Sequence, residues 1–176
     1  MGRITPAEPV KLFIGMISNQ TALFDEVRPP LVARFGPTDL ESPVYPWTHT
    51  AYYEKELGPD LKRRFLFFKQ PVPSDALPEI KRFTNELEQR WIRTAGQGNF
   101  RRINLDPGYL APSKIVLATT KDYAHRIYLR DGIYAEVTLV YQGKSFLPLP
   151  HTYPDFRSEE YIALFNQARG LMLKSG

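Results

Sequence analysis

The sequence contains no cysteine, and this absence removes several kinds of chemistry together. Disulfide bonds, cysteine-ligated zinc, iron–sulfur clusters and thiol nucleophiles all need that side chain. Long apolar runs are missing too, since no stretch of about 18 apolar residues is available to span a bilayer. We therefore expect no disulfides, no membrane partner and a cytoplasmic location.

A large excess of either charge is also missing. The 23 Lys and Arg residues against 19 Asp and Glu residues give a net charge of +4, which is far from the dense basic stripe of a dedicated nucleic-acid binder. The small positive excess favours anionic partners. With 43% hydrophobic residues in 176, the chain is long enough to bury one core, and residues 1–176 are expected to form a single domain.

What the sequence does contain is an alternation of strand and helix patterns. The apolar run 10–18 predicts a strand. A helix is expected over 19–35, because apolar residues recur there at helical spacing, namely Leu23, Val27, Leu31 and Phe35. Pro29 and Pro30 lie inside that pattern, so we expect a kink or two short helices.

The next residues predict a hairpin and a second helix. Two β-rich runs, 47–58 and 61–72, are separated by a Gly-Pro-Asp turn signal. The helix is expected to begin at Ser74 or the residue after it and to stop at Gly96, with an apolar stripe formed by Ile80, Phe83, Leu87 and Trp91. A strand over 101–106 completes the unit.

The resulting order β-α-β-β-α-β is that of a ferredoxin-like fold in the α+β class, with two helices on one face of an antiparallel sheet. Beyond Gly108 the pattern changes to a meander of strands, with turns at Asp131-Gly132 and Gln142-Gly143. Apolar residues after Ser158 predict a closing helix. We therefore expect a ferredoxin-like (βαββαβ) core with an appended antiparallel β-meander and a C-terminal helix.

Residues 103–129, INLDPGYLAPSKIVLATTKDYAHRIYL, concentrate groups that bind phosphate, metal or protons. Alternation places Asn104 and Asp106 on one face of a strand. Asp106 is then either a turn residue bonded to its own backbone or a carboxylate at a strand end beside a loop. Thr120 and Lys121 follow the next strand, where they either hold a phosphate or carboxylate or form a polar loop.

The hairpin after this segment raises a question of register. If Asp131-Gly132 is a two-residue turn, His125 lies diagonal to Glu136, and the two form a candidate catalytic pair in which Glu orients an acid or base imidazole. If the loop has three residues and a bulge, Arg126 opposes Glu136 in an ion pair. The Asp-Gly dipeptide favours the first alternative, with Arg126 then available to hold phosphate.

The second predicted helix has a polar flank. Lys81, Asn85 and Glu88 fall within about 60° of each other at about 100° per residue, beside the apolar stripe. They form either a solvated, salt-bridged surface or one wall of a cleft, where Lys81 and Asn85 bind a ligand. A Mg²⁺ ion held by Asp106 or Glu88 is chemically easy, because one or two carboxylates plus phosphate oxygens suffice.

Several blocks of the chain match a known family. KRFTNELE, NLDPGYL, ATTKDYAHRIYL, GIYAEVTLVY and TYPDF occur in this order, and over nearly its whole length the chain resembles domain of unknown function 4416, a family of short bacterial and archaeal proteins. The family brings no established reaction, ligand or catalytic residue. Some of its members carry the label "GTP-binding protein".

The residues do not support that label. A P-loop needs G-x-x-x-x-G-K-[ST] so that backbone amides surround the phosphates, and GQGNFRR at 96–102 lacks the Lys-Ser/Thr. Thr120-Lys121-Asp122 approaches a guanine-reading motif but places the Asp one residue early. His49, His125 and His151 show no zinc-binding spacing. The pattern is not that of a P-loop GTPase.

Three functions remain open. The first is binding, with or without turnover, of a small anionic, phosphate-containing ligand such as a nucleotide, in a pocket lined by 104–126 and Glu136. The second is an RNA-recognition module, which requires one exposed face that carries Phe13, Phe65 and Phe67. The third is a non-catalytic adaptor or assembly subunit that uses the aromatic and proline residues of 29–53 for contact.

Overall fold

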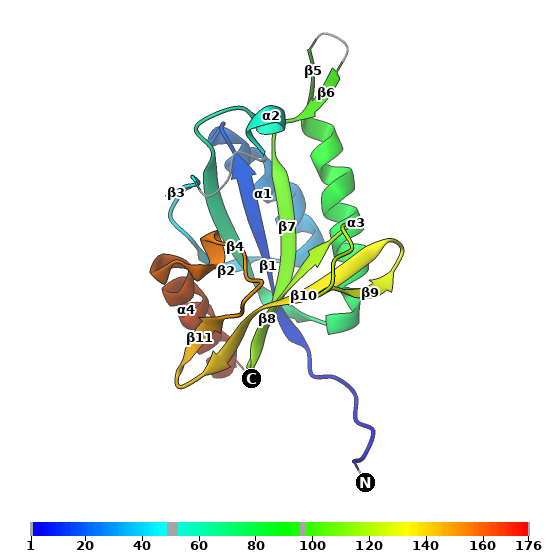
Figure 1. The fold of residues 1–176 in the computed structure, drawn as a ribbon, viewed down its shortest axis with the longest axis vertical. Helices are drawn as coiled ribbons and strands as arrows, with labels where there is room; N and C mark the ends of the chain where they lie inside the picture. Colours follow the sequence, from blue (N-terminus) through cyan, green and yellow to red (C-terminus); the bar gives the residue numbers. More distant parts are fainter. Residues whose placement is uncertain (1, 49–52, 96–97, 176) are drawn as a thin grey trace.

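The computed structural model describes residues 2–48, 53–95 and 98–175. It has a mixed α/β architecture in which helices cover a large antiparallel sheet (Figure 1). The helices are α1 (Ala22–Phe35), α2 (Glu54–Leu57), α3 (Leu77–Glu88) and the C-terminal α4 (Glu159–Ser175), with short 3₁₀ helices η1 (Ser74–Ala76), η2 (Gln89–Trp91) and η3 (Asp155–Arg157). None of the helices in the described ranges is long and apolar enough to cross a membrane.

Within the described residues, one sheet has the strand order β11-β10-β8-β7-β1-β4-β2, with β3 beside β4 and β9 beside β10. All of these pairs are antiparallel. The strands are β1 (Val10–Ser18), β2 (Thr38–Glu41), β3 (Tyr45–Pro46), β4 (Lys62–Val72), β7 (Asn104–Ala111), β8 (Lys114–Thr119), β9 (Ile127–Arg130), β10 (Ile133–Gln142) and β11 (Ser145–Pro148). A separate hairpin of β5 (Ile92–Ala95) and β6 (Gly98–Arg101) projects from one end of the molecule, and the N-terminal segment extends from the other (Figure 1).

Alternation along β1 sends side chains to both faces of the sheet, and both faces are buried. Leu12, Ile14 and Met16 pack with the apolar residues of α1 and α3. Phe13 points to the opposite face, where its ring lies 5.0 Å from that of Phe165 in α4. The sheet is therefore the middle of three layers.

The three phenylalanines named for RNA recognition share one face of the sheet, but that face is not exposed. Phe13, Phe65 and Phe67 are completely buried. The ring of Phe165 lies 5.0, 5.6 and 5.5 Å from their respective rings. Because α4 covers them, these rings cannot stack on bases in this structure.

Helix α1 is continuous from Ala22 to Phe35 although Pro29 and Pro30 lie inside it, so the expectation of two short helices is wrong, and the kink stays a prediction. The two carbonyl groups that lose a donor belong to Asp25 and Glu26, which are exposed residues. Water can satisfy carbonyls on that side of the helix. The buried stripe therefore holds the helix on the sheet without interruption.

The predicted strand over 47–58 is wrong in its described part, because Glu54–Leu57 form α2; 49–52 lie outside the described residues. Beside β4, on the side away from β1, lie instead the short strands β2 and β3. The four half-buried and mostly polar residues of β2 give little alternation to detect. The aromatic and apolar residues that suggested a strand gather in a small cluster made by Trp47, Tyr53, Leu57 and Leu61 with Ile17.

Helix α3 is shorter than predicted, since it ends at Glu88 and is followed by η2. Ile92–Ala95 then form a strand that pairs with Gly98–Arg101, in agreement with the β preference of Ile and Thr. The predicted stop, Gly96, lies outside the described residues. The apolar stripe nevertheless packs as expected on the sheet, through Ile80, Phe83, Leu87 and Trp91.

Candidate functional site

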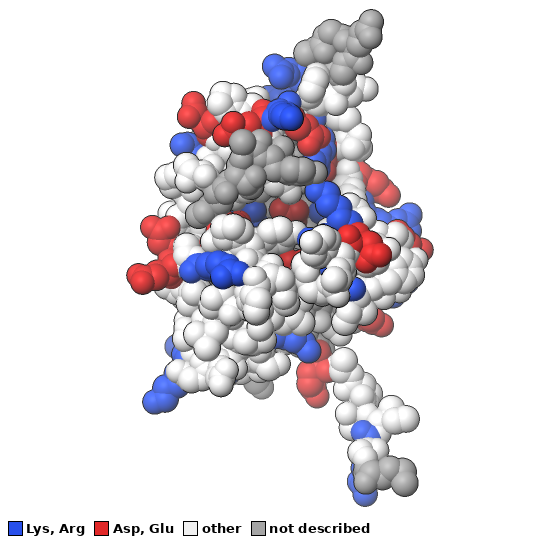
Figure 2. Space-filling model, in the orientation of Figure 1, with Lys and Arg blue, Asp and Glu red and all other residues white. Residues whose placement is uncertain are grey.

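A cavity of about 800 Å³ lies beside the sheet, with walls from α3, η3 and the end of β8. Its size is within the range of small-molecule sites. Figure 2 shows charged side chains of both signs around a hollow on this face. The cavity is lined by nearly all of the side chains singled out from the sequence, namely Lys81, Asn85, Glu88, Asn104, Asp106, Thr120, Lys121, Arg126 and Glu136.

Strand β7 supplies Asn104 and Asp106. The strand continues through Asp106 to Ala111, so the alternative of a turn at this aspartate is wrong. Asn104 Nδ2 donates to Asp106 Oδ2 at 2.7 Å, and Lys81 Nζ lies 3.5 Å from Oδ1. Burial alone would raise the pKa of Asp106, but the charges of Lys81 and Arg63 and the Asn104 hydrogen bond outweigh it and lower that pKa. The carboxylate is therefore ionised at neutral pH.

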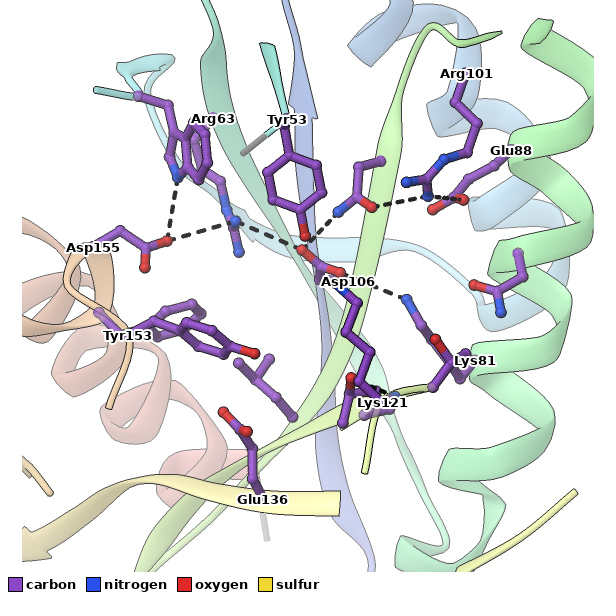
Figure 3. A pocket seen from close by; sticks show the side chains of 18 of the residues that line it. Tyr53, Arg63, Lys81, Glu88, Arg101, Asp106, Lys121, Glu136, Tyr153 and Asp155 are labelled. Atoms are coloured by element: carbon purple, nitrogen blue, oxygen red, sulfur yellow. Dashed lines mark hydrogen bonds and ion pairs between the residues drawn. The ribbon is translucent and has the colours of Figure 1, made fainter. Parts of the chain in front are cut away.

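Arg63 of β4 lies beside Asp106 with only 3% of its side chain exposed. Its Nη1 is 3.7 Å from Asp106 Oδ2 and 3.6 Å from Asp155 Oδ2 (Figure 3). Burial opposes the charge, but these two carboxylates raise the pKa of Arg63. Gly15 of β1 provides the space for this guanidinium, since a Cβ there would lie 2.6 Å from Nη2. Arg63 thus ties the sheet to η3 under the cavity.

Two side chains of α3 take the place of a strand at the edge of β7. Strand β8 pairs with β7 only over Gly108–Ala111, which leaves the edge at Leu105 without a neighbouring strand. Lys81 Nζ donates to Leu105 O at 2.9 Å, and Leu105 N donates to Glu88 Oε1 at 2.6 Å. Lys81 and Glu88 are only 6% and 2% exposed, so their interpretation as a solvated surface is wrong.

Arg101 of β6 connects α2 and α3 at the same wall. Its Nε and Nη2 donate to Glu56 at 2.6 and 2.7 Å, and Nη1 donates to Glu88 Oε2 at 2.6 Å and to Asn104 Oδ1 at 3.0 Å. The hydrogen bond to Glu56 is the main reason that the pKa of Arg101 is raised. Burial raises the pKa of Glu88 in spite of the neighbouring Lys81 and Arg101.

The hairpin register combines the two alternatives drawn from the sequence. Arg130 opposes Ile133, so Asp131-Gly132 is a two-residue turn as predicted. A bulge follows, and Ala135 pairs with Ile127. The extra residue shifts the register, which brings the segment before β9 close to the next residue of β10.

As a result, His125 and Arg126 both contact Glu136, and they share one oxygen. His125 Nε2 lies 3.1 Å from Oε2, and Arg126 Nε donates to Oε2 at 2.8 Å. The Glu136 side chain is 1% exposed. Its Oε1 has no hydrogen-bond partner among the described residues. Glu136 lines the cavity, and Figure 3 shows its carboxylate directed into it.

The end of β8 contributes hydroxyl and cationic groups at the mouth. Thr119 Oγ1 accepts from the backbone N of Lys121 at 3.2 Å. Arg126 Nη1 donates to Lys121 O at 3.0 Å, and Nη2 donates to the Tyr153 hydroxyl at 2.5 Å. Arg126 thereby joins the loop after β8, Glu136 and the segment before η3 at one place.

Aromatic rings from distant segments line the cavity on the side of η3: Trp47, Tyr53, Tyr153 and Phe156. Trp47 Nε1 donates to Asp155 Oδ2 at 3.4 Å. The Tyr53 hydroxyl lies close to Asp106 (Figure 3), whose negative charge raises the pKa of Tyr53. Burial and the charge of Glu136 raise the pKa of Tyr153 to about 12. Both phenols are therefore protonated at neutral pH.

His125, predicted as catalytic, is not among the residues that line the cavity. Its ring stacks on His151 with centroids 4.2 Å apart. His151 Nε2 donates to Val137 O at 3.0 Å. His125 is thus fixed against Glu136, and any contribution to the site passes through that carboxylate.

The two carboxylates named for Mg²⁺ are already engaged by protein groups. Asp106 is occupied by Asn104, Lys81 and Arg63, and Glu88 by Arg101 and a backbone N–H. In the ranges that the structure describes, no three His, Asp or Glu side chains lie together as ion ligands. Both carboxylates accept hydrogen bonds from protein donors, and the Mg²⁺ site stays a prediction.

Four further residues of the site were not identified from the sequence, namely Arg63, Arg101, Tyr153 and Asp155. Arg63 had a detectable signal, because it shares its parity along β4 with the buried Phe65 and Phe67. An arginine on a buried face of a strand is rare without partners. The other three lie in segments noted in the sequence, Arg101 in the predicted strand 101–106 and the other two in the block TYPDF, but nothing local directs them to the cavity.

Residues 8–171 match the family model described as "Domain of unknown function (DUF4416)". No curated protein and no solved structure matches the chain.

Proposed function

The chain belongs to the family described as domain of unknown function (DUF4416); since that description names no function, we propose one from the geometry of the cavity. The protein binds a small anionic, phosphate-containing ligand such as a nucleotide. The observation that carries this proposal is the convergence of donors from separate segments on one cavity. Lys81 and Asn85 come from α3, Thr120 and Lys121 from the end of β8, and Arg126 from the segment before β9.

The rest of the cavity suits the other parts of a nucleotide. Tyr153, which is 40% exposed, offers a ring for a base to stack on, since base–aromatic stacking contributes about 1–3 kcal/mol. Asp106 is held ionised by its neighbours, which makes it an acceptor for a sugar hydroxyl. A volume of about 800 Å³ accommodates a mononucleotide.

Binding is better supported than catalysis. The predicted acid–base pair of His125 and Glu136 is in contact, but Arg126 donates to the same carboxylate oxygen. His125 stands outside the cavity lining, so we assign it a positioning role. The RNA alternative has less support, because the rings of Phe13, Phe65 and Phe67 are buried. In the segment named for the adaptor alternative, Trp47 is buried and Val44 is 43% exposed.

We propose in addition that the core is ferredoxin-like. The order β7-β1-β4-β2, with α1 and α3 packed on one face, supports this assignment. The strands β8 to β11 then extend the core sheet as the expected meander. The cytoplasmic location stays a prediction.

Isothermal titration with nucleoside monophosphates and inorganic phosphate tests the binding function. Lys121→Ala is expected to weaken nucleotide binding about tenfold, because a hydrogen bond to a charged group contributes about 1.5–3 kcal/mol. The matched control is Lys69→Ala, which removes an exposed lysine of β4. The proposal is contradicted if none of these compounds binds, or if the two substitutions weaken nucleotide binding equally.

A further inference from the structure

The Glu136 carboxylate has one oxygen in use and one without a partner. Oε2 accepts from Arg126 and lies next to His125, whereas Oε1 has no hydrogen-bond partner among the described residues and very little accessible surface, although Glu136 lines the cavity. A buried acceptor in this state is costly. The cost is removed by any ligand in the cavity that brings a donor to Oε1.

We propose that the ligand is a nucleotide whose base carries an amino group, and that this amino group donates to Oε1 of Glu136. The inference rests on the nucleotide-binding function proposed above and adds a specificity-determining residue to it. A base with a carbonyl at the same position would place two acceptors against each other, which disfavours its binding.

The charges around Glu136 favour a neutral donor over an ammonium group. Arg126 already places a full positive charge 2.8 Å from Oε2. The carboxylate is therefore compensated, and a second buried cation would pay a desolvation cost without an unpaired charge to meet. An aromatic amino group supplies the N–H and leaves the charge balance unchanged.

The surroundings of Glu136 suit a planar base. Leu117, which pairs with Glu136 across β8 and β10, also lines the cavity. In Figure 3 the ring of Tyr153 stands beside the Glu136 carboxylate, and Arg63 and Asp155 lie on the far side of the cavity. A base held between these apolar and aromatic surfaces would direct its edge to Oε1 and its sugar toward the remaining polar groups.

Two pairs of nucleotides test the inference by titration calorimetry, because each pair differs by an amino group or a carbonyl at one ring position. Cytidine monophosphate is compared with uridine monophosphate, and adenosine monophosphate with inosine monophosphate. The wild-type protein is expected to bind the amino member of at least one pair about tenfold more tightly.

The substitution Glu136→Gln should reverse this preference. Arg126 Nε is only a donor, so the amide oxygen must occupy the position of Oε2. The amide NH₂ then takes the position of Oε1 and donates instead of accepting. The variant is expected to prefer uridine or inosine monophosphate, whereas Glu86→Gln, at an exposed position of α3, keeps the wild-type preference.

A further ligand keeps the test valid if the Glu136 variant fails to fold. An analogue of the preferred amino-bearing nucleotide from which the amino group has been removed is expected to bind the wild-type protein about tenfold more weakly than its parent. Equal affinities within both pairs, or a preference that Glu136→Gln leaves unchanged, overturn the inference but leave nucleotide binding intact. If none of the four nucleotides binds, the proposed function itself fails.

Discussion

At the scale of single residues, Asp106 is a cavity carboxylate that three other cavity-lining residues approach. Lys81, Arg63 and Asn104 all approach it, and together they lower its pKa against the effect of burial. The folded state therefore binds the Asp106 proton less tightly than the unfolded chain does. The resulting stabilisation is present above the unfolded pKa of about 3.9 and is lost as the pH falls through the lower folded value.

Asp106→Asn is expected to reduce the free energy of unfolding at pH 7 by about 1–3 kcal/mol, because two buried cations lose their partner. The deficit relative to the wild type should shrink as the pH falls from about 5 toward 2. Urea unfolding over this pH range measures both effects. Asp60→Asn, at an exposed position, serves as control, and a deficit that stays constant with pH would contradict the assignment.

Which of these residues could be found from the sequence depends on how local their signal is. Asn104 and Asp106 were identified because strand alternation alone places them on one face. Asp155 accepts from Trp47, which is 108 residues away in the chain, and Arg101 donates to Glu56, which is 45 residues away. No periodicity records such a distance, so these residues appear only once the chain is folded.

At the scale of elements, α3 does the work of a missing strand. Its spacing predicted that Lys81, Asn85 and Glu88 share a flank, and all three line the cavity. The sequence did not show that β8 leaves β7 unpaired at Leu105. An unpaired strand edge needs partners for its N–H and C=O groups, and this need explains why a lysine and a glutamate are buried there.

Glu88→Ala tests whether this side chain of α3 protects the unpaired edge of β7. The Leu105 N–H loses its acceptor at 2.6 Å, so we expect its amide hydrogen to exchange with solvent at least about tenfold faster, in line with a loss of 1–3 kcal/mol. Exchange measured by NMR at single amides gives the result. Glu86→Ala on the exposed side of the same helix is the control, and an unchanged rate at Leu105 would show that Glu88 does not protect this edge.

Elements with a strong period were predicted well, whereas weakly patterned ones were not. The apolar stripes of α1 and α3 gave their existence and their buried faces. The second core strand, β2, has only four residues, all of them half-buried, so it offers no alternation. The aromatic residues near Trp47 led to a wrong strand prediction, because the β preference of a residue reflects side-chain packing as much as backbone conformation.

At the scale of the whole molecule, α4 determines what the sheet can do. The sequence predicted a C-terminal helix but not the surface that the helix covers, since the position of the helix depends on packing between residues that are distant in the chain. Phe165 of α4 contacts the rings of Phe13, Phe65 and Phe67. The helix thereby closes one face of the sheet and confines the open part of that face to the cavity beside η3.

If the two layers of helices and the sheet form one cooperative unit, damage to one face must destabilise the whole. Phe165→Ala removes a fully buried ring and should lower the free energy of unfolding by about 3–5 kcal/mol.

Trp91 packs on the opposite face, with α1 and α3. With Trp47 replaced by Phe, so that Trp91 alone reports, the fluorescence and the far-ultraviolet circular dichroism should therefore shift to the same lower midpoint in urea, as a two-state transition requires. Leu173→Ala, at a position of α4 that is 52% exposed, should change stability by less than about 0.5 kcal/mol. Two separate transitions in the Phe165 variant would mean that the faces unfold independently, and the expectation of a single domain over residues 1–176 would then be wrong.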